Sequence, residues 1–107
     1  MPKYLFRASY TAEGTKALIK GGGGTARRVA IQQMAQSVEG KVEAFYYAFG
    51  EDDVIGIVDV PNNVTAAAIS LAINAGGAAS TKLTVLLTPE EIDQAAKKTV
   101  TYRPPGG

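Results

Sequence analysis

The chain lacks three residue types altogether: cysteine, histidine and tryptophan are absent from its 107 residues. Without cysteine, disulfides, thiolate metal sites and thiol nucleophiles are excluded. Without histidine, the chain has neither the commonest metal ligand nor the side chain that titrates near neutral pH. Acid–base chemistry would therefore depend on Asp, Glu, Lys or Tyr with a shifted pKa. We predict no cofactor and no metal site.

An excess of charge of one sign is also absent. The 11 basic and 10 acidic side chains leave a formal net charge of +1, whereas nucleic-acid and anionic-membrane binders carry a basic surplus. No apolar run approaches the roughly 20 residues of a membrane span. The first residues also lack the basic segment and apolar run of a signal peptide. We therefore expect a cytoplasmic protein without a nucleic-acid or membrane partner.

The residues that are present indicate an ordinary globular domain. Hydrophobic residues make up 46% and charged residues 20% of the chain, which are typical values for such domains. A chain of this length supports one modest core. We place the domain at residues 1–99 and an irregular tail at residues 100–107.

The spacing of apolar residues predicts the order β-α-β-β-α-β followed by a C-terminal helix. The expected strands are residues 4–10, 42–49, 54–60 and 81–87. The expected helices are a short turn after Thr11, residues 25–38, a segment capped by Asn62 or Asn63, and a segment from the Thr88–Pro89 cap to about residue 98. Right-handed crossovers turn this order into the ferredoxin-like α+β fold, a four-stranded antiparallel sheet with two helices on one face.

The central hairpin is apolar on both faces of its strands. Alternation places Val42, Ala44, Tyr46 and Ala48 on one face, and Phe45, Tyr47 and Phe49 on the other. A sheet with one face in water should alternate more cleanly, and helices cover only one face of this fold. A second copy of the chain is the simplest cover for the other face. We predict a homodimer with its sheets packed face to face, or a larger homo-oligomer.

The same hairpin carries a family resemblance. The run GKVEAFYYAFGEDDVIGIVDVPNN resembles the central motif of the GYD domain family, small proteins of the dimeric α/β-barrel type. The supporting residues are Gly40-Lys41, Phe45-Tyr46, Gly50-Glu51, Asp53, Val54 and Pro61, with Tyr10-Thr11, Gly14 and residues 81–91 outside the run. The resemblance implies the fold and oligomerisation, and it implies no reaction.

Two departures from the family pattern stand out. Asp52 occupies the position where the family name has tyrosine, and four consecutive glycines stand where a short polar or proline-containing linker is expected. The first departure removes any role of that tyrosine from this chain. The second indicates either a specialised ligand loop or a flexible connection.

The hairpin turn is the first candidate site, because it carries three adjacent carboxylates at residues 51–53. Clustered carboxylates can bind a hard cation, and they raise one another's pKa. The alternative is turn chemistry, since Gly and Asp are favoured in hairpin loops for backbone reasons alone. We retain two of the three as ligand-binding candidates, namely Glu51 and Asp53.

The glycine run at residues 21–24 is the second candidate. Backbone N–H groups at the start of a helix can bind an anion, and Arg27 and Arg28 in the first helical turn oppose the helix dipole unless an anion lies between them. The alternative is a flexible linker with solvated arginines. The run lacks the Gly-Lys-Ser/Thr ending of a phosphate-binding P-loop. The candidate residues are Gly22, Gly23, Gly24, Thr25 and Arg28.

The aromatic residues of the first hairpin strand are the third candidate. On the face away from the helices they would line a pocket against a partner subunit, with Arg7 holding an acidic ligand. The alternative is interface packing, in which Arg7 pairs with Glu43 or Asp59. The candidate residues are Arg7 and Tyr47, with Phe45, Tyr46 and Phe49 beside them.

These candidates leave three functional hypotheses. The first is a ligand-binding or regulatory homo-oligomer whose site takes a small anionic molecule at the glycine-rich loop or a subunit interface. The second is a cofactor-free enzyme of the monooxygenase or isomerase kind, against which the absence of histidine counts. The third is a structural assembly module, which would gain nothing from a glycine run of such high conformational entropy. We favour the first hypothesis.

Overall fold

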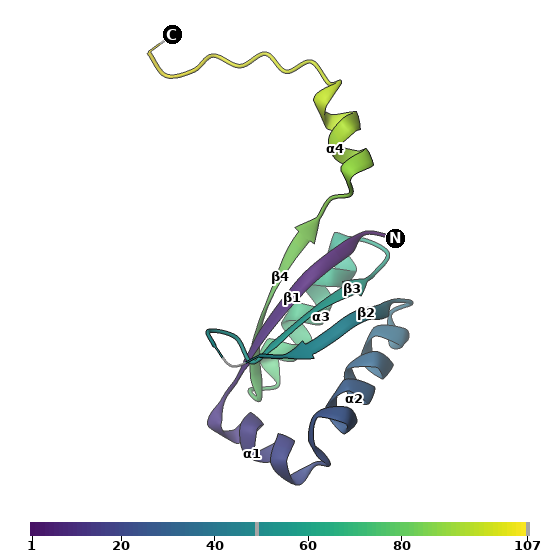
Figure 1. Ribbon diagram of the computed structural model, residues 1–107, viewed down its shortest axis with the longest axis vertical. Helices are drawn as coiled ribbons and strands as arrows, with labels where there is room; N and C mark the ends of the chain where they lie inside the picture. Colours follow the sequence, from purple (N-terminus) through teal and green to yellow (C-terminus); the bar gives the residue numbers. More distant parts are fainter. Residues whose placement is uncertain (49, 107) are drawn as a thin grey trace.

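The computed structural model describes residues 1–48 and 50–106. Phe49 and Gly107, which the predicted second strand and the predicted tail include, lie outside the described residues. Strands and helices alternate along the chain (Figure 1) as β1 (Lys3–Tyr10), α1 (Ala12–Lys20), α2 (Gly23–Ser37), β2 (Lys41–Tyr47), β3 (Val54–Asp59), α3 (Asn63–Ala75), β4 (Ala79–Leu86) and α4 (Pro89–Ala96).

The four strands form one antiparallel sheet with the order β2-β3-β1-β4. The first strand therefore lies inside the sheet, and each crossover skips over a neighbouring strand. This is the arrangement of the ferredoxin-like α+β fold, so the predicted fold is confirmed. The three predicted helix caps are also confirmed, because the side chains of Thr11, Asn62 and Thr88 each accept a backbone N–H of the helix that follows.

The hydrophobic core lies between the sheet and two helices, α2 and α3. From the sheet, β1 contributes Tyr4 and Phe6, and β3 contributes Val54 and Val58, all of them buried. From the helices, the buried residues are Ala35, Ala66 and Ile69. The residues of each strand are two positions apart, as expected for one face of a pleated strand.

A β-bulge in β2 changes which aromatic side chains face the core. The pairing with β3 shifts between Val42 and Ala44, and a shift of one residue moves the following side chains to the opposite face. Phe45 and Tyr47 therefore lie opposite Gly56 and Val54, on the face that the helices cover. The prediction that these aromatics lie away from the helices is wrong for both of them.

Aromatic contacts agree with the bulge. Phe45 lies with its ring centroid 6.0 Å from that of Phe6 and 5.4 Å from that of Tyr47. Tyr46 takes the opposite face and is 71% exposed. One aromatic residue of β2, and not the whole group, belongs to the open face of the sheet.

The ion pairs on the open face of the sheet show that the predicted partners of Arg7 are wrong. Lys3 lies opposite Asp59 in the sheet, and its Nζ lies 3.0 Å from the Asp59 carboxylate and 2.7 Å from that of Glu43. Both predicted acidic partners are therefore taken by Lys3. Arg7 instead has its Nε 4.0 Å from the carboxylate of Asp52.

The glycine run breaks one helical connection into two helices. Gly22 and Gly23 have φ values of 97° and 79°, in the left-handed region that favours glycine. The chain turns there, and α2 starts at Gly23. The prediction that the whole run lies outside the helix is therefore wrong for Gly23 and Gly24, which form its first turn.

The C-terminal part of the chain projects from the sheet (Figure 1). Residues 87–106, which include α4, are all exposed. The radius of gyration is 17.1 Å, compared with about 13 Å for a compact chain of this length. No helix in the described part of the chain has the length and apolar character needed to cross a membrane.

Candidate functional site

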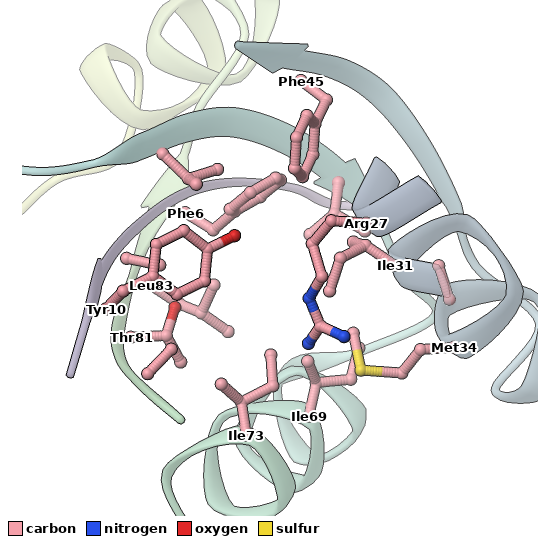
Figure 2. A pocket seen from close by; sticks show the side chains of 15 residues that line it. Phe6, Tyr10, Arg27, Ile31, Met34, Phe45, Ile69, Ile73, Thr81 and Leu83 are labelled. Carbon is pink, nitrogen blue, oxygen red and sulfur yellow. The ribbon is translucent and has the colours of Figure 1, made fainter. Parts of the chain in front are cut away.

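A cavity lies between the sheet and the two helices that cover it (Figure 2). Helix α2 packs against β2, and α3 packs against β4, so the two helices stand over opposite edges of the sheet and leave space above its centre. The cavity volume is about 50 Å³, counted for the centre of a water molecule. Its walls are formed by Phe6, Ala8, Tyr10, Arg27, Ile31, Met34, Ala35, Phe45, Val54, Val58, Ile69, Ile73, Ala79, Thr81 and Leu83.

Three of these residues are polar: Tyr10, Arg27 and Thr81. The hydroxyl of Thr81 donates a hydrogen bond to the carbonyl of Arg7 (3.0 Å). Its lone pairs remain free to accept. Figure 2 shows the Tyr10 hydroxyl and the Arg27 guanidinium directed into the enclosed space from opposite sides. The cavity is therefore apolar except for a few convergent polar groups, as small-molecule sites usually are.

Arg27 is the most informative of the three. Within residues 1–48 and 50–106, its guanidinium has no hydrogen-bond or ion-pair partner. A guanidinium offers five donors in a planar fork that matches a carboxylate or phosphate. In Figure 2 its neighbours are Met34, Ile31 and Ile69. The cation thus stands beside apolar side chains and has no acidic partner there.

Tyr47 does not line the cavity, but it interacts with two of its polar residues, Tyr10 and Arg27. Its hydroxyl donates to the carbonyl of Gly24 (3.3 Å). Burial, with a further contribution from Tyr10, raises the pKa of Tyr47 to about 12, although the positive charge of Arg27 acts in the opposite direction. The phenol is therefore neutral at physiological pH and acts as a hydrogen-bond donor, not as a base.

None of the nine candidate residues from the sequence lines this cavity, and one group of them lies around the start of α2. Gly24 lies against the ring of Tyr47, and a Cβ atom built at Gly24 would meet that ring at 2.8 Å. Gly22 and Gly23 precede it at the turn into α2. Thr25 and Arg28 are exposed on the first turns of α2 and do not line the cavity.

The other group lies at the end of the sheet where β1 finishes and β3 begins. Asp53 accepts the backbone N–H of Tyr10 (2.8 Å) and donates its own N–H to the carbonyl of Ala8 (2.9 Å). It thereby fixes the strand end that carries Tyr10. Glu51 is exposed, and its carbonyl accepts from Ser9 (3.3 Å). No group of three or more acidic side chains in the described residues is placed to hold a metal ion.

Tyr10 and Thr81 were not among the predicted site residues, and Arg27 was considered only together with Arg28 as part of an anion site at the glycine run. A signal for Arg27 was present in the sequence. The apolar stripe of α2 runs through Ile31, Met34 and Ala35, and Arg27 lies one turn before Ile31 on the same face. Both Arg27 and Arg28 are exposed, but only Arg27 continues the apolar stripe and lines the cavity.

Comparison with known proteins agrees with this architecture. No curated protein and no solved structure matches the chain. A family model described as the GYD domain matches residues 4–96, which extend from β1 to the end of α4. The chain therefore belongs to the GYD domain family.

Proposed function

We propose that this protein is a small cytosolic homo-oligomer that binds an amphipathic organic acid in the cavity between the sheet and its helices. The observation that carries the proposal is the unpartnered guanidinium of Arg27 at the wall of an apolar cavity. The apolar part of the ligand would occupy the cavity, and its anionic group would bind Arg27.

The side chains of the cavity wall support a ligand with one apolar part and one anionic group. Burial of an apolar group stabilises a complex by about 25 cal/mol per Å², and the side chains around Ile69 and Ile73 provide that surface. A charge-assisted, bidentate bond between a guanidinium and a carboxylate is among the stronger hydrogen-bond arrangements. Tyr10 adds a hydroxyl donor from the opposite wall.

Binding is favoured over catalysis by the state of Tyr47. A general base needs a pKa near the operating pH, and the pKa of Tyr47 is raised to about 12. The Arg27 guanidinium can hold and orient an anion, but neither it nor the Tyr47 phenol accepts a proton near neutral pH. A structural assembly module is disfavoured because a cavity with Arg27 in its wall does not contribute to assembly.

The homo-oligomer rests on exposed apolar side chains outside the cavity. The open face of the sheet carries Ile55 and the largely exposed Tyr46, and the projecting C-terminal part carries Leu87 and Ile92, each more than half exposed. Apolar surface of this kind usually marks an interface. Sedimentation equilibrium should show self-association, and a monomer at all concentrations would contradict it.

The direct test compares an acid with its neutral amide. Titration calorimetry should detect 3-methylbutanoate, whose isopropyl group is small enough for the cavity, but not 3-methylbutanamide, because only the acid can pair with Arg27. At one hundred times its Kd the acid should stabilise the fold by about 2.7 kcal/mol in thermal unfolding. Arg27→Gln should abolish both effects.

Arg28→Gln is the matched control, since it removes the same charge one residue away, at a position that lines neither this cavity nor the hollow between α1 and α2. This variant should bind 3-methylbutanoate like the wild type. Equal losses of affinity in the two variants would show that the effect depends only on net charge. Unchanged binding by Arg27→Gln would refute the proposed site.

A further inference from the structure

A second hollow lies beside the cavity, between α1 and α2. Its volume is about 220 Å³ in the same measure, larger than that of the cavity. We call it the interhelical groove. Its walls are Tyr10, Gly14, Ala17, Leu18, Gly21, Gly23, Ala26, Arg27, Ala30 and Ala78.

The interhelical groove and the cavity share two wall residues, Tyr10 and Arg27. These are also the polar groups that project into the cavity from opposite sides (Figure 2). The two hollows are therefore neighbours across one polar junction. An anion bound by Arg27 has an apolar compartment on each side.

Close backbone packing holds α1 in place over one end of the groove. A Cβ atom built at Gly14 would lie 1.9 Å from the carbonyl oxygen of Ala78, so only glycine allows this approach. The hydroxyl of Thr11 also donates to the carbonyl of Gly77 (3.0 Å). The groove is thus bounded by a helix that is anchored to the start of β4, and it is a defined feature of the fold.

The sizes of the two hollows restrict the ligand. The cavity accepts one small apolar group, because its volume corresponds to only a few water molecules. The larger groove accepts a longer group. Since Arg27 lines both hollows, a ligand that fills both and pairs with Arg27 must carry its anionic group between two apolar arms.

We infer that the ligand is a carboxylic acid substituted on the carbon next to the carboxylate, with one arm in the cavity and the other in the interhelical groove. This inference rests on the proposed function and adds the class of acid to it. A linear acid with its carboxylate at Arg27 fills only one of the two hollows.

The test uses acids that share a carboxylate and a small isopropyl group, which suits the cavity, and that differ in the second arm: 3-methylbutanoate, 2-ethyl-3-methylbutanoate and 2-butyl-3-methylbutanoate. Calorimetric affinity should rise along the series by up to about fourfold for each methylene that enters the groove. Ala30→Leu places a larger side chain in the groove wall. It should remove this rise while leaving the affinity for 3-methylbutanoate within twofold.

Ala17→Leu fills the same groove from α1 and gives an independent result if the first variant does not fold. Ala67→Leu is the control, because Ala67 is exposed on α3 and lines neither hollow. It should preserve the whole series.

The two proposals fail in different ways. Equal affinity for all three acids, or an equal loss for all three in Ala30→Leu, would overturn the role of the groove and leave the Arg27 site intact. Absence of binding by every acid would overturn the proposed function and this inference with it.

Discussion

The two crossover connections of this fold differ in structure and in the residues that they bury. The second connection, between β3 and β4, is the single helix α3, and it buries Ala66 and Ile69 in the core. The first connection, between β1 and β2, is broken into α1 and α2 at the glycine run, and α1 buries only Gly14. The second connection stabilises the sheet and supplies Ile69 and Ile73 to the cavity wall, whereas the first supplies Arg27 and both helices that border the interhelical groove.

The difference follows from where the chain turns. A continuous helix would lie along the sheet, as α3 does. The positive φ values of Gly22 and Gly23 redirect the chain so that two helices meet, and the interhelical groove lies between them. Helix α2 then starts at the junction, which places Arg27 on its second turn at the cavity wall. The conformational freedom of glycine therefore determines where the functional residues lie.

The largest expected effect is on the second connection. Ile69→Ala removes a side chain that is 6% exposed in the core, and it should lower the free energy of unfolding by about 2–5 kcal/mol. Urea unfolding followed by circular dichroism measures this loss. Leu71→Ala, on the same helix but 72% exposed, is the control and should cost at most about 0.5 kcal/mol. Similar losses for the two variants would contradict the assignment of α3 to the core.

A smaller loss is expected at the contact between α1 and β4. Gly14→Ala should destabilise the protein by about 1–3 kcal/mol through overpacking against the Ala78 carbonyl, although the same change within a free helix is stabilising by up to about 1 kcal/mol. The sign of the change in urea unfolding is therefore diagnostic. Gly50→Ala, where a Cβ would meet nothing within 4 Å, should change stability little. A more stable Gly14→Ala variant would show that α1 is not held against β4.

Removal of a helix cap should affect ligand binding differently in the two connections. Thr11→Ala and Asn62→Ala should each lower stability by about 1 kcal/mol, because each removes a side chain that accepts a backbone N–H, of Gly14 (3.1 Å) and Thr65 (2.9 Å) respectively. Only Thr11→Ala should also weaken the binding of 2-butyl-3-methylbutanoate, because it loosens α1 over the interhelical groove. Calorimetry measures the affinity of both variants for this acid. If Thr11→Ala and Asn62→Ala bind it equally well, the groove is not part of the ligand site.

The smallest expected effect is a change at high pH. Because the pKa of Tyr47 is raised from 10.0 to about 12, the unfolded chain releases this proton first. Its contribution to stability is complete below pH 10 and is lost as the pH rises through about 12. Tyrosinate absorbance should show a late phase that Tyr47→Phe removes and that Tyr46→Phe, on the open face, retains. Persistence of that phase in Tyr47→Phe would assign it to another residue.

Much of the fold was predictable because its signals are local. Alternating apolar residues mark the strands, and the Thr11, Asn62 and Thr88 caps mark the helix starts through hydrogen bonds that span only three residues. The strand order then follows from general rules of chain connection. The family match over residues 4–96 agrees with this prediction.

The site was less predictable because it depends on contacts between distant residues. The bulge between Val42 and Ala44 moves Phe45 and Tyr47 to the core face, and nothing in the alternation of β2 marks it. Arg7 and Asp53, both candidates from the sequence, lie on the open face and at the strand end, away from the cavity where Arg27 points.

The sequence by itself determined the elements, their caps and the topology of the sheet, because periodicity, capping and chain connection act over short separations or follow general rules. Only the tertiary structure decided which faces the aromatics occupy, that Arg27 and not Arg28 enters a cavity, and that two hollows meet at Tyr10 and Arg27. Those features depend on a register shift, on two positive φ angles and on the spacing of helices over the sheet. Each of them is fixed by packing between segments far apart in the chain.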